Sequence, residues 1–259
     1  MSETTLDGLI TSVDAARDPG DLWHCAVDLL VAEGAATLCY HNYPRPSAES
    51  DPFVALHGWP EALSRRYLED GLWRIDPMHR LARSSAGVVS WTDLYNQTDI
   101  TPAQAEMIVE VEKVGLRGGI AFQVAGPRLR SGAISIGFDV PVAKLLPLAI
   151  RRLQVIAQTC HLRLCTLTPE RDGPLPQLSP RERDIVDLIV MGASNKAIAR
   201  DLGVSPHTVD TLIRRLFAKL GVSDRTSAAI FAIGAGMVLP QDVRPAKVRP
   251  RDEGSGVAP

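Results

Sequence analysis

The chain has 259 residues and a formal net charge of −2 at pH 7, which excludes a general basic coat for nucleic acid, so any DNA affinity must be local to one face of one domain. It shows neither a charged leader followed by an apolar run nor the roughly 18 consecutive apolar residues of a membrane span, and we expect a cytoplasmic protein with no membrane contact. Its four cysteines, Cys25, Cys39, Cys160 and Cys165, form no CxxC pair and have no His at metal-ligand spacing, which predicts buried thiols and neither metal nor cofactor.

A polar, proline-containing break divides the chain into two domains of unequal size. We predict a ligand-binding and dimerisation domain at residues 1–167, a linker at 168–177, a DNA-binding domain at 178–239 and a tail at 240–259. The tail is rich in Pro, Gly and charged residues, a composition typical of disorder.

The first domain alternates helical and strand patterns. Helices are predicted at 5–16, 21–33, 60–70, from 76 onward, and at 102–114 and 143–165. Strands are predicted at 36–43, 52–58, 87–91, 119–124 and 132–138. Together they predict an α+β protein whose first domain is an α/β/α sandwich around an antiparallel sheet.

The last two of these strands each place bulky residues on one face and small ones on the other. A face of Gly, Ala and Ser leaves room either for a ligand or for a closely packed helix, and the pattern alone leaves both open. The helix at 143–165 has an apolar stripe that includes Leu146, Leu153 and Leu164, and its other side is also fairly apolar. This second apolar side suggests contact with a partner subunit.

The second domain has regular helix caps. Ser179, Pro180 and Glu182 form the pattern of a capping box, and Ser194 and Ser205 can cap the next two helices. Glycines at 192, 203 and 221 can end the three helices, and a fourth follows at 225–236. A compact four-helix domain is therefore predicted.

The third of these helices, "PHTVDTLIRRLFAKL", has two distinct faces. Its apolar residues recur every three or four positions, which predicts that they pack on the other helices: Val209, Ile213, Leu216 and Leu220. The opposite face is polar and free to meet DNA.

The stretch "LSPRERDIVDLIVMGASNKAIARDLGVSPHTVDTLIRRLFAKLGVSDRTSAA" closely resembles the helix-turn-helix of LuxR-type transcriptional regulators. The resemblance implies a recognition helix in the major groove and a homodimer on an inverted repeat of double-stranded DNA. We expect Arg214 to read a base, with Lys196, Arg215 and Lys219 on phosphates. The other expected contact residues are His207, Thr208, Asp210 and Thr211.

Asp210 departs from the family, in which a basic residue is common at this position. Its carboxylate could accept a hydrogen bond from cytosine, pair with Arg214 four residues later, or only reduce nonspecific phosphate affinity. The local ion pair, which would orient Arg214, is favoured because it needs no particular base.

The resemblance extends to "GWPEALSRRYLEDGLWRIDPMHRLARSSAGVVSWTDL", which looks like the N-acyl-homoserine-lactone-binding domain of quorum-sensing members. It implies that Tyr67 donates to the acyl carbonyl and that Asp76 accepts from the amide N–H. It also implies that Trp91 packs over the ligand, that Gly119 permits close backbone approach, and that Ser135 lies near the amide end.

Leu63 stands where the family usually has a Trp whose indole N–H meets the lactone carbonyl. Trp59 and Trp73 are near in sequence but do not occupy that position. An unpaired buried carbonyl costs about 1–3 kcal/mol. We therefore expect either a different head group or a different donor.

Other function classes have less support. The chain has no phosphate-binding glycine loop, G-x-S-x-G elbow or His pair with metal spacing, so no enzyme is predicted. The antiparallel pattern disfavours a phosphorylated response regulator. The prediction is a ligand-responsive DNA-binding transcriptional regulator sensing an acyl-homoserine-lactone-like or other amphiphile. The alternative is a regulator whose first domain only dimerises or binds a protein.

Overall fold

The structure is a computed structural model that describes residues 5–43, 53–97, 99–115, 118–127, 129–168 and 176–238. The chain divides into two compact units, Met1–Arg171 (the larger unit) and Asp172–Pro259 (the smaller unit). The predicted tail at 240–259 and residues 169–175 of the predicted linker lie outside the described residues. Within the described ranges, no helix is long and apolar enough to cross a membrane.

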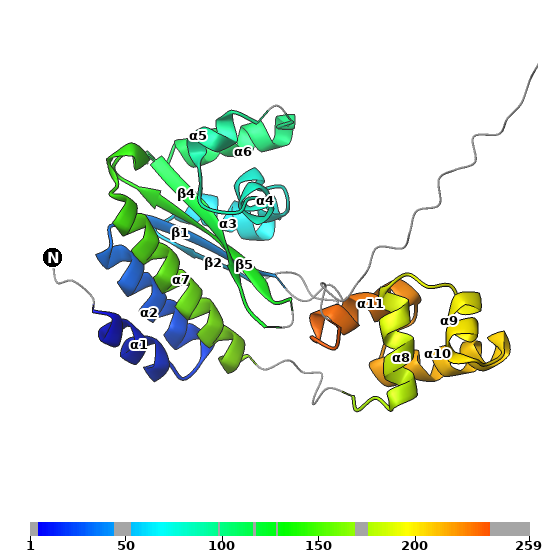
Figure 1. Cartoon of the computed structure of the whole chain (residues 1–259). Helices are drawn as coiled ribbons and strands as arrows, with labels where there is room; N and C mark the ends of the chain where they lie inside the picture. Colours follow the sequence, from blue (N-terminus) through cyan, green and yellow to red (C-terminus); the bar gives the residue numbers. More distant parts are fainter. Residues whose placement is uncertain are drawn as a thin grey trace, which may run out of the picture. The chain divides into compact units, whose positions relative to one another are not determined.

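A five-stranded antiparallel sheet forms the middle of the larger unit as far as it is described (Figure 1). The strands are β1 (Thr37–Tyr43), β2 (Phe53–His57), β3 (Val89–Ser90), β4 (Gly118–Ala125) and β5 (Ser131–Phe138), in the order β2-β1-β5-β4-β3. The predicted antiparallel sheet is confirmed, but the predicted strand at 87–91 is shorter. It ends at Ser90 because this residue and Asp93 form a capping box that starts helix α5 (Trp91–Tyr95).

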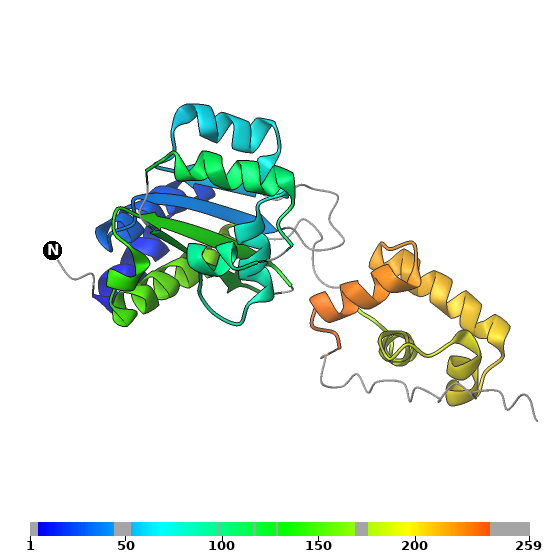
Figure 2. The ribbon, with the colours of Figure 1, turned by 90° about the horizontal axis from the view of Figure 1, so that it is seen from above.

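Three helices cover the bulky face of the sheet: α1 (Leu6–Ala15), α2 (Pro19–Ala32) and α7 (Pro147–Leu167) (Figures 1 and 2). Ile120, Phe122 and Ile136 of the sheet share a buried apolar core with these helices. The prediction that the last helix starts at 143 was wrong, because residues Val142–Lys144 form a short 3-10 turn and the helix begins only at Pro147. Leu146 therefore lies outside the buried stripe and is 72% exposed.

The opposite face carries α3 (Glu61–Glu69), the 3-10 turn η1 (Leu72–Arg74), α4 (Pro77–Ser84), α5 and α6 (Pro102–Glu112) (Figure 2). Met78 and Ala82 of α4 pack on Ala121 and Ala133, two of the small residues of the sheet. Ser135, on the same face, lines a cavity. The packed-helix interpretation is confirmed for one part of the small face, and the other part borders a cavity, where a ligand remains a prediction.

Four helices make up the described part of the smaller unit: α8 (Pro180–Val190), α9 (Asn195–Leu202), α10 (Pro206–Leu220) and α11 (Arg225–Gly234). The predicted caps are confirmed: Ser179 and Glu182 form a capping box, and Ser194 and Ser205 each accept from a backbone N–H of the first turn. Gly203 and Gly221 end α9 and α10 with positive φ, a conformation that favours glycine. The predicted apolar face of α10 is buried.

Candidate ligand pocket and DNA-binding face

A cavity of about 60 Å³ lies in the larger unit between the small face of the sheet and the helices that cover it. Helices α5 and α6 contribute apolar side chains, among them Leu94, Met107 and Val111. Polar groups come from the sheet and from the start of α4, including Ser135 and Asp76. The cavity thus has apolar walls and a few polar side chains, the composition typical of a small-molecule site.

Asp76 is a buried carboxylate with two strong partners. Its Oδ2 accepts a hydrogen bond of 2.6 Å from the Tyr67 hydroxyl, and its Oδ1 accepts one of 2.8 Å from the Met78 backbone N–H. The second bond makes Asp76 the N-cap of α4, with Pro77 at the first helical position. Burial raises the pKa of Asp76, and the bond from Tyr67 opposes that rise.

Tyr67 is fully buried in α3, and its hydroxyl is held inside the protein. Besides the bond to Asp76, it lies 2.9 Å from His41 Nε2 and 3.5 Å from the Cys39 thiol. The sequence implied that Tyr67 donates to a ligand carbonyl. In this structure the hydroxyl proton goes to Asp76 instead, so such a bond requires Tyr67 to exchange partners.

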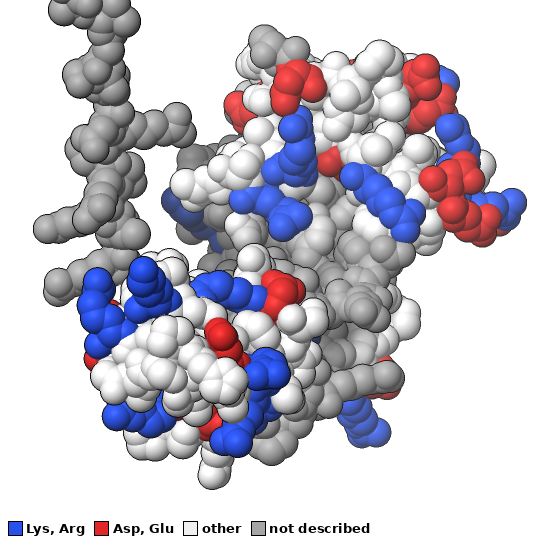
Figure 3. All heavy atoms as spheres, turned by 90° about the vertical axis from the view of Figure 1, so that its right-hand side faces the viewer, with Lys and Arg blue, Asp and Glu red and all other residues white. Residues whose placement is uncertain are grey.

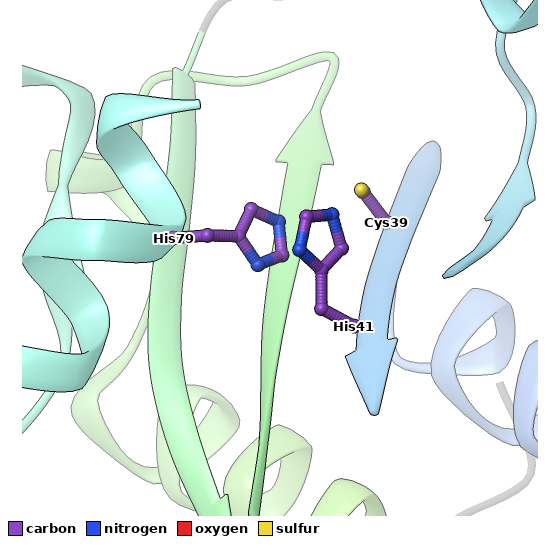
Figure 4. A group of neighbouring side chains, drawn as sticks. All are labelled: Cys39, His41 and His79. Carbon is purple, nitrogen blue, oxygen red and sulfur yellow. The ribbon is translucent and has the colours of Figure 1, made fainter. Parts of the chain in front are cut away.

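Two histidines, His41 and His79, lie next to the hydrogen-bonded pair of Tyr67 and Asp76, and the sequence analysis identified neither of them. The rings of His41 and His79 stack with centroids 3.6 Å apart (Figure 4). His79 Nε2 also lies 3.3 Å from Ser135 Oγ. A signal was present in "TLCYHNY", because residues 39 and 41 of a strand point to the same face. The interpretation that no cysteine has a His at metal-ligand spacing was wrong for Cys39. Residues two positions apart on a strand share a face, so the His41 side chain lies near that of Cys39.

Trp91 lines the cavity from the first turn of α5, and Gly119 of β4 makes room for it. A side-chain carbon built at Gly119 would lie 2.3–2.7 Å from three atoms of the Trp91 indole. The glycine thus permits close approach, as the resemblance implied, but the group that approaches is the Trp91 ring.

Leu63 is buried in α3 and is not among the residues that line the cavity. Trp59, just before α3, does line it, and its ring centroid lies 5.1 Å from that of Tyr67. The indole of Trp59 therefore forms part of the cavity wall, and the side chain of Leu63 does not. Chain order did not reveal this because Trp59 precedes the helix.

The second candidate site is the polar face of α10. His207, Thr208, Asp210, Arg214 and Arg215 are exposed on it. Thr211 is half-buried, and Lys196 is exposed on the neighbouring helix α9. In the view of Figure 3, Lys and Arg side chains of the described residues lie interspersed with Asp and Glu side chains rather than forming one continuous basic surface.

The carboxylate of Asp210 does not pair with Arg214, and the favoured interpretation was wrong. Its Oδ1 accepts a 2.7 Å hydrogen bond from the side-chain amide of Asn195, at the start of α9. Arg214 instead donates through Nε to the backbone carbonyl of Asp210, at 3.4 Å. Asn195 in turn accepts from Arg225 of α11. Asp210 thus ties the recognition helix to its neighbours, a tertiary contact that local spacing could not reveal.

Lys219 also has a partner inside the domain. Its ammonium lies 2.8 Å from Glu182, the residue that completes the capping box of α8. Hydrogen bonds from Lys219 and Ser179 lower the pKa of Glu182 to about 2. Contact of Lys219 with phosphate would compete with this ion pair, so Lys196, Arg214 and Arg215 are better placed to meet DNA.

A capped helix-turn-helix with an exposed polar face, in one chain with an α/β/α unit that contains a cavity, is the architecture typical of a DNA-binding transcription factor with a second, separate domain. The family model of the autoinducer binding domain matches residues 18–164, and that of the bacterial regulatory proteins of the luxR family matches residues 176–232. The chain therefore belongs to the LuxR-type transcriptional regulators with an autoinducer-binding domain. Members of this family bind DNA and autoinducer-type ligands and are not enzymes.

Individual relatives agree with this assignment. The chain is 32% identical to the HTH-type transcriptional regulator y4qH of Sinorhizobium fredii, over 80% of this chain and 63% of that protein, so it spans less than two thirds of that relative. It is 24% identical to the transcriptional activator BjaR1 of Bradyrhizobium diazoefficiens, over 80% and 85%. The fold is that of Escherichia coli SdiA, with a TM-score of 0.59 at 21% identity over 90% of this chain and 97% of SdiA. A second SdiA structure, with the same TM-score at 20% identity, holds octanoyl-rac-glycerol.

Proposed function

We propose that the larger unit senses a small amphiphile with an amide or similar polar centre, and that the smaller unit carries the response to DNA. The supporting observation is the Asp76 carboxylate, which is buried at a cavity with otherwise mostly apolar walls. A ligand N–H that reaches Asp76 would add a charge-assisted hydrogen bond, while an acyl chain would lie against the side chains of α5 and α6.

The head group is recognised differently from an ordinary homoserine lactone. Leu63 offers no donor, and we take the indole of Trp59 as its replacement, because Trp91, the other indole that lines the cavity, packs against Gly119. Because Trp59 comes from the segment before α3, its N–H meets an acceptor at another place. The octanoyl-rac-glycerol in the SdiA structure is an acylated ligand without a lactone, and it supports the proposal that the ligand of this chain also lacks an ordinary lactone head group.

The size of the cavity links binding to a change of structure. Ligand pockets commonly measure about 300–1,000 Å³, whereas this cavity measures about 60 Å³. An amphiphile therefore has to displace some of the lining, and the α6 side chains Met107, Ile108 and Val111 are candidates. Such a displacement is how ligand binding would alter the rest of the chain.

On the DNA side, we expect a homodimer that places α10 of each subunit in the major groove of an inverted repeat. Arg214 would read a base, and Lys196 and Arg215 would contact phosphates. Exposed leucines support a dimer through the larger unit, since Leu6 is 64%, Leu146 72% and Leu148 69% exposed.

Calorimetry with a short panel of acylated ligands tests the pocket. Asp76→Asn should weaken binding of the true ligand sharply, because a neutral amide is a poorer acceptor for a buried N–H. Asp18→Asn is the matched control, since Asp18 also caps a helix that starts with Pro but is exposed. Undiminished affinity in Asp76→Asn would contradict the pocket assignment.

The head-group proposal has its own test. Leu63→Trp should improve affinity for simple acyl-homoserine lactones, and Trp59→Phe should weaken the true ligand. Nanomolar binding of a simple lactone by the wild type would contradict altered recognition. Thermal unfolding tests ligand sensing itself, because a bound ligand raises the unfolding temperature of the larger unit. If neither the amphiphiles nor an organic extract of the culture raised it, the alternative function would apply, in which this domain only dimerises or binds a protein.

DNA binding is tested by gel shift with a selected operator. Arg214→Ala should remove about 1–3 kcal/mol of discrimination at one base pair per half-site. Arg183→Ala serves as a control that removes a charge from α8 rather than α10. Unchanged specificity in Arg214→Ala would show that another residue reads the base.

A further inference from the structure

Three side chains next to the pocket bring metal-ligating atoms together. Cys39 and His41 on β1 and His79 on α4 each offer one such atom, all within 4.8 Å of one another. All three residues are buried, at 1%, 1% and 2% exposure. Figure 4 shows the two imidazoles next to one another, with the Cys39 sulfur beside the His41 ring.

The fold holds these residues in place from two directions. Cys39 and His41 share a face of β1 because they are two residues apart on a strand. His79 lies in the first turn of α4, whose start is fixed by Asp76 and Pro77. The cluster is thus anchored on regular elements rather than on loops, an arrangement that suits a precise ligand set.

The protein alone does not satisfy the polar atoms of this cluster. His79 Nδ1 is buried and has no hydrogen-bond partner among the described residues. A neutral imidazole carries a lone pair on one of its two ring nitrogens. Neutral imidazole is the form that binds metal ions.

We propose that Cys39, His41 and His79 form a binding site for a transition metal of the Zn²⁺ type. One sulfur and two nitrogen donors suit Zn²⁺, and oxygen-seeking Mg²⁺ and Ca²⁺ are disfavoured. Binding requires the thiol of Cys39 to release its proton, so a Zn²⁺ ion with one thiolate and two imidazoles carries one net positive charge. The carboxylate of Asp76, 3.8 Å from His79 Nε2, offsets that charge.

Second contacts of the histidines also fit this role. His41 has a hydroxyl near each ring nitrogen, Tyr67 at 2.9 Å and Tyr43 at 3.3 Å. When one nitrogen binds metal, the other therefore keeps a partner that fixes the ring, as is usual for metal-bound histidine. In a tetrahedral zinc site, neighbouring ligand atoms lie about 3.3–3.7 Å apart, so the rings must tilt out of their stack on binding.

The fourth position is open to the pocket. Cys39 and Asp76 both line the cavity, so a water or a small molecule that enters it can complete the tetrahedron. Metal binding needs neither DNA nor an amphiphile, and it can be measured whether or not the proposed function holds.

The test uses the full chain, purified without a histidine tag, stripped of metal with a chelator and kept reduced. Titration with Co²⁺ should give visible d–d absorption that saturates at one ion per chain, together with a sulfur-to-cobalt band in the near ultraviolet. Zn²⁺ should displace the Co²⁺ and abolish both signals.

Variants locate the site. Cys39→Ser should lose the sulfur band and bind Co²⁺ at least about 10-fold more weakly, and His79→Gln should weaken binding similarly. Cys160→Ser is the matched control and should keep both bands, since this buried cysteine belongs to the core on the other face of the sheet. If His79→Gln fails to fold, the comparison of the Co²⁺ spectra of the wild type and Cys39→Ser decides whether the site exists. Absence of a saturating d–d band in the wild type, or a sulfur band that survives in Cys39→Ser, would overturn the proposal.

Discussion

The pocket of the larger unit and the DNA-binding face of the smaller unit hold their polar groups in opposite ways. Around Asp76 the polar atoms are buried and bond to one another across β1, α3 and α4. On α10 they are exposed, and several are held by single bonds, such as that between Asn195 and Asp210. A buried polar group left without its partner is costly, whereas water replaces a lost partner at the surface. Substitutions in the pocket should therefore destabilise the protein more than those on α10.

The largest effect is expected at Asp76. Asp76→Ala removes the helix cap and leaves the Tyr67 hydroxyl without its acceptor, so the free energy of unfolding should fall by about 2–4 kcal/mol. Asp18→Ala removes only an exposed cap of the same Asp-Pro type and should cost about 1 kcal/mol. Tryptophan fluorescence during urea unfolding measures both, because all four tryptophans lie in the larger unit. Equal losses would show that the buried bonds add nothing to the cap.

Gly119 comes next. Gly119→Ala would place a methyl group against the Trp91 indole and should lower the free energy of unfolding by about 1–3 kcal/mol, since the ring must shift. Gly87→Ala is the control, because a side-chain carbon there meets nothing within 4 Å. It should change stability by no more than about 0.5 kcal/mol. A stable Gly119→Ala protein with unchanged Trp91 emission would contradict the close packing of this pair.

A smaller loss of stability is expected from substitutions at Asp210, on the exposed face of α10. Asp210→Ala and Asn195→Ala should each cost about 0.5–1.5 kcal/mol, and the double variant should cost less than their sum because both remove one bond. Hydrogen exchange of the α9 and α10 amides measures this. Asp210→Ala should also raise nonspecific DNA affinity, since one negative charge leaves the interface. Full additivity would show that the bond between Asn195 and Asp210 contributes no stability.

The smallest effect is a pH dependence at Glu182. Its pKa is lowered from 4.5 to about 2 in the folded protein, so the stabilisation is present above pH 4.5 and is lost as the pH falls towards 2. The pair with Lys219 is partly exposed, so we expect only about 0.5–1 kcal/mol. Exchange of the α8 amides should differ between wild type and Glu182→Gln at pH 6, and the difference should shrink steadily below pH 4.5. A difference that grew on acidification would contradict this ion pair.

The sequence by itself determined the elements whose signals are local. Ser179 with Glu182, Ser205 with Pro206, and Gly221 start and end helices through bonds within one turn, and they predicted the smaller unit almost residue by residue. Alternation predicted the β4–β5 hairpin for the same reason, because the period of a strand is fixed by its backbone. Boundaries failed at Ser90 and Leu146, where a cap and a 3-10 turn end the pattern.

Only the tertiary structure decided which side chains meet. Asp210 bonds to Asn195 instead of Arg214, Gly119 accommodates Trp91, and Trp59 rather than Leu63 reaches the cavity. Each of these outcomes depends on how two elements approach one another, and the spacing of residues along one element carries no information on that approach. His41 and His79 lie 38 positions apart in the sequence and stack only because α4 packs on the face of the sheet from which the His41 side chain of β1 projects.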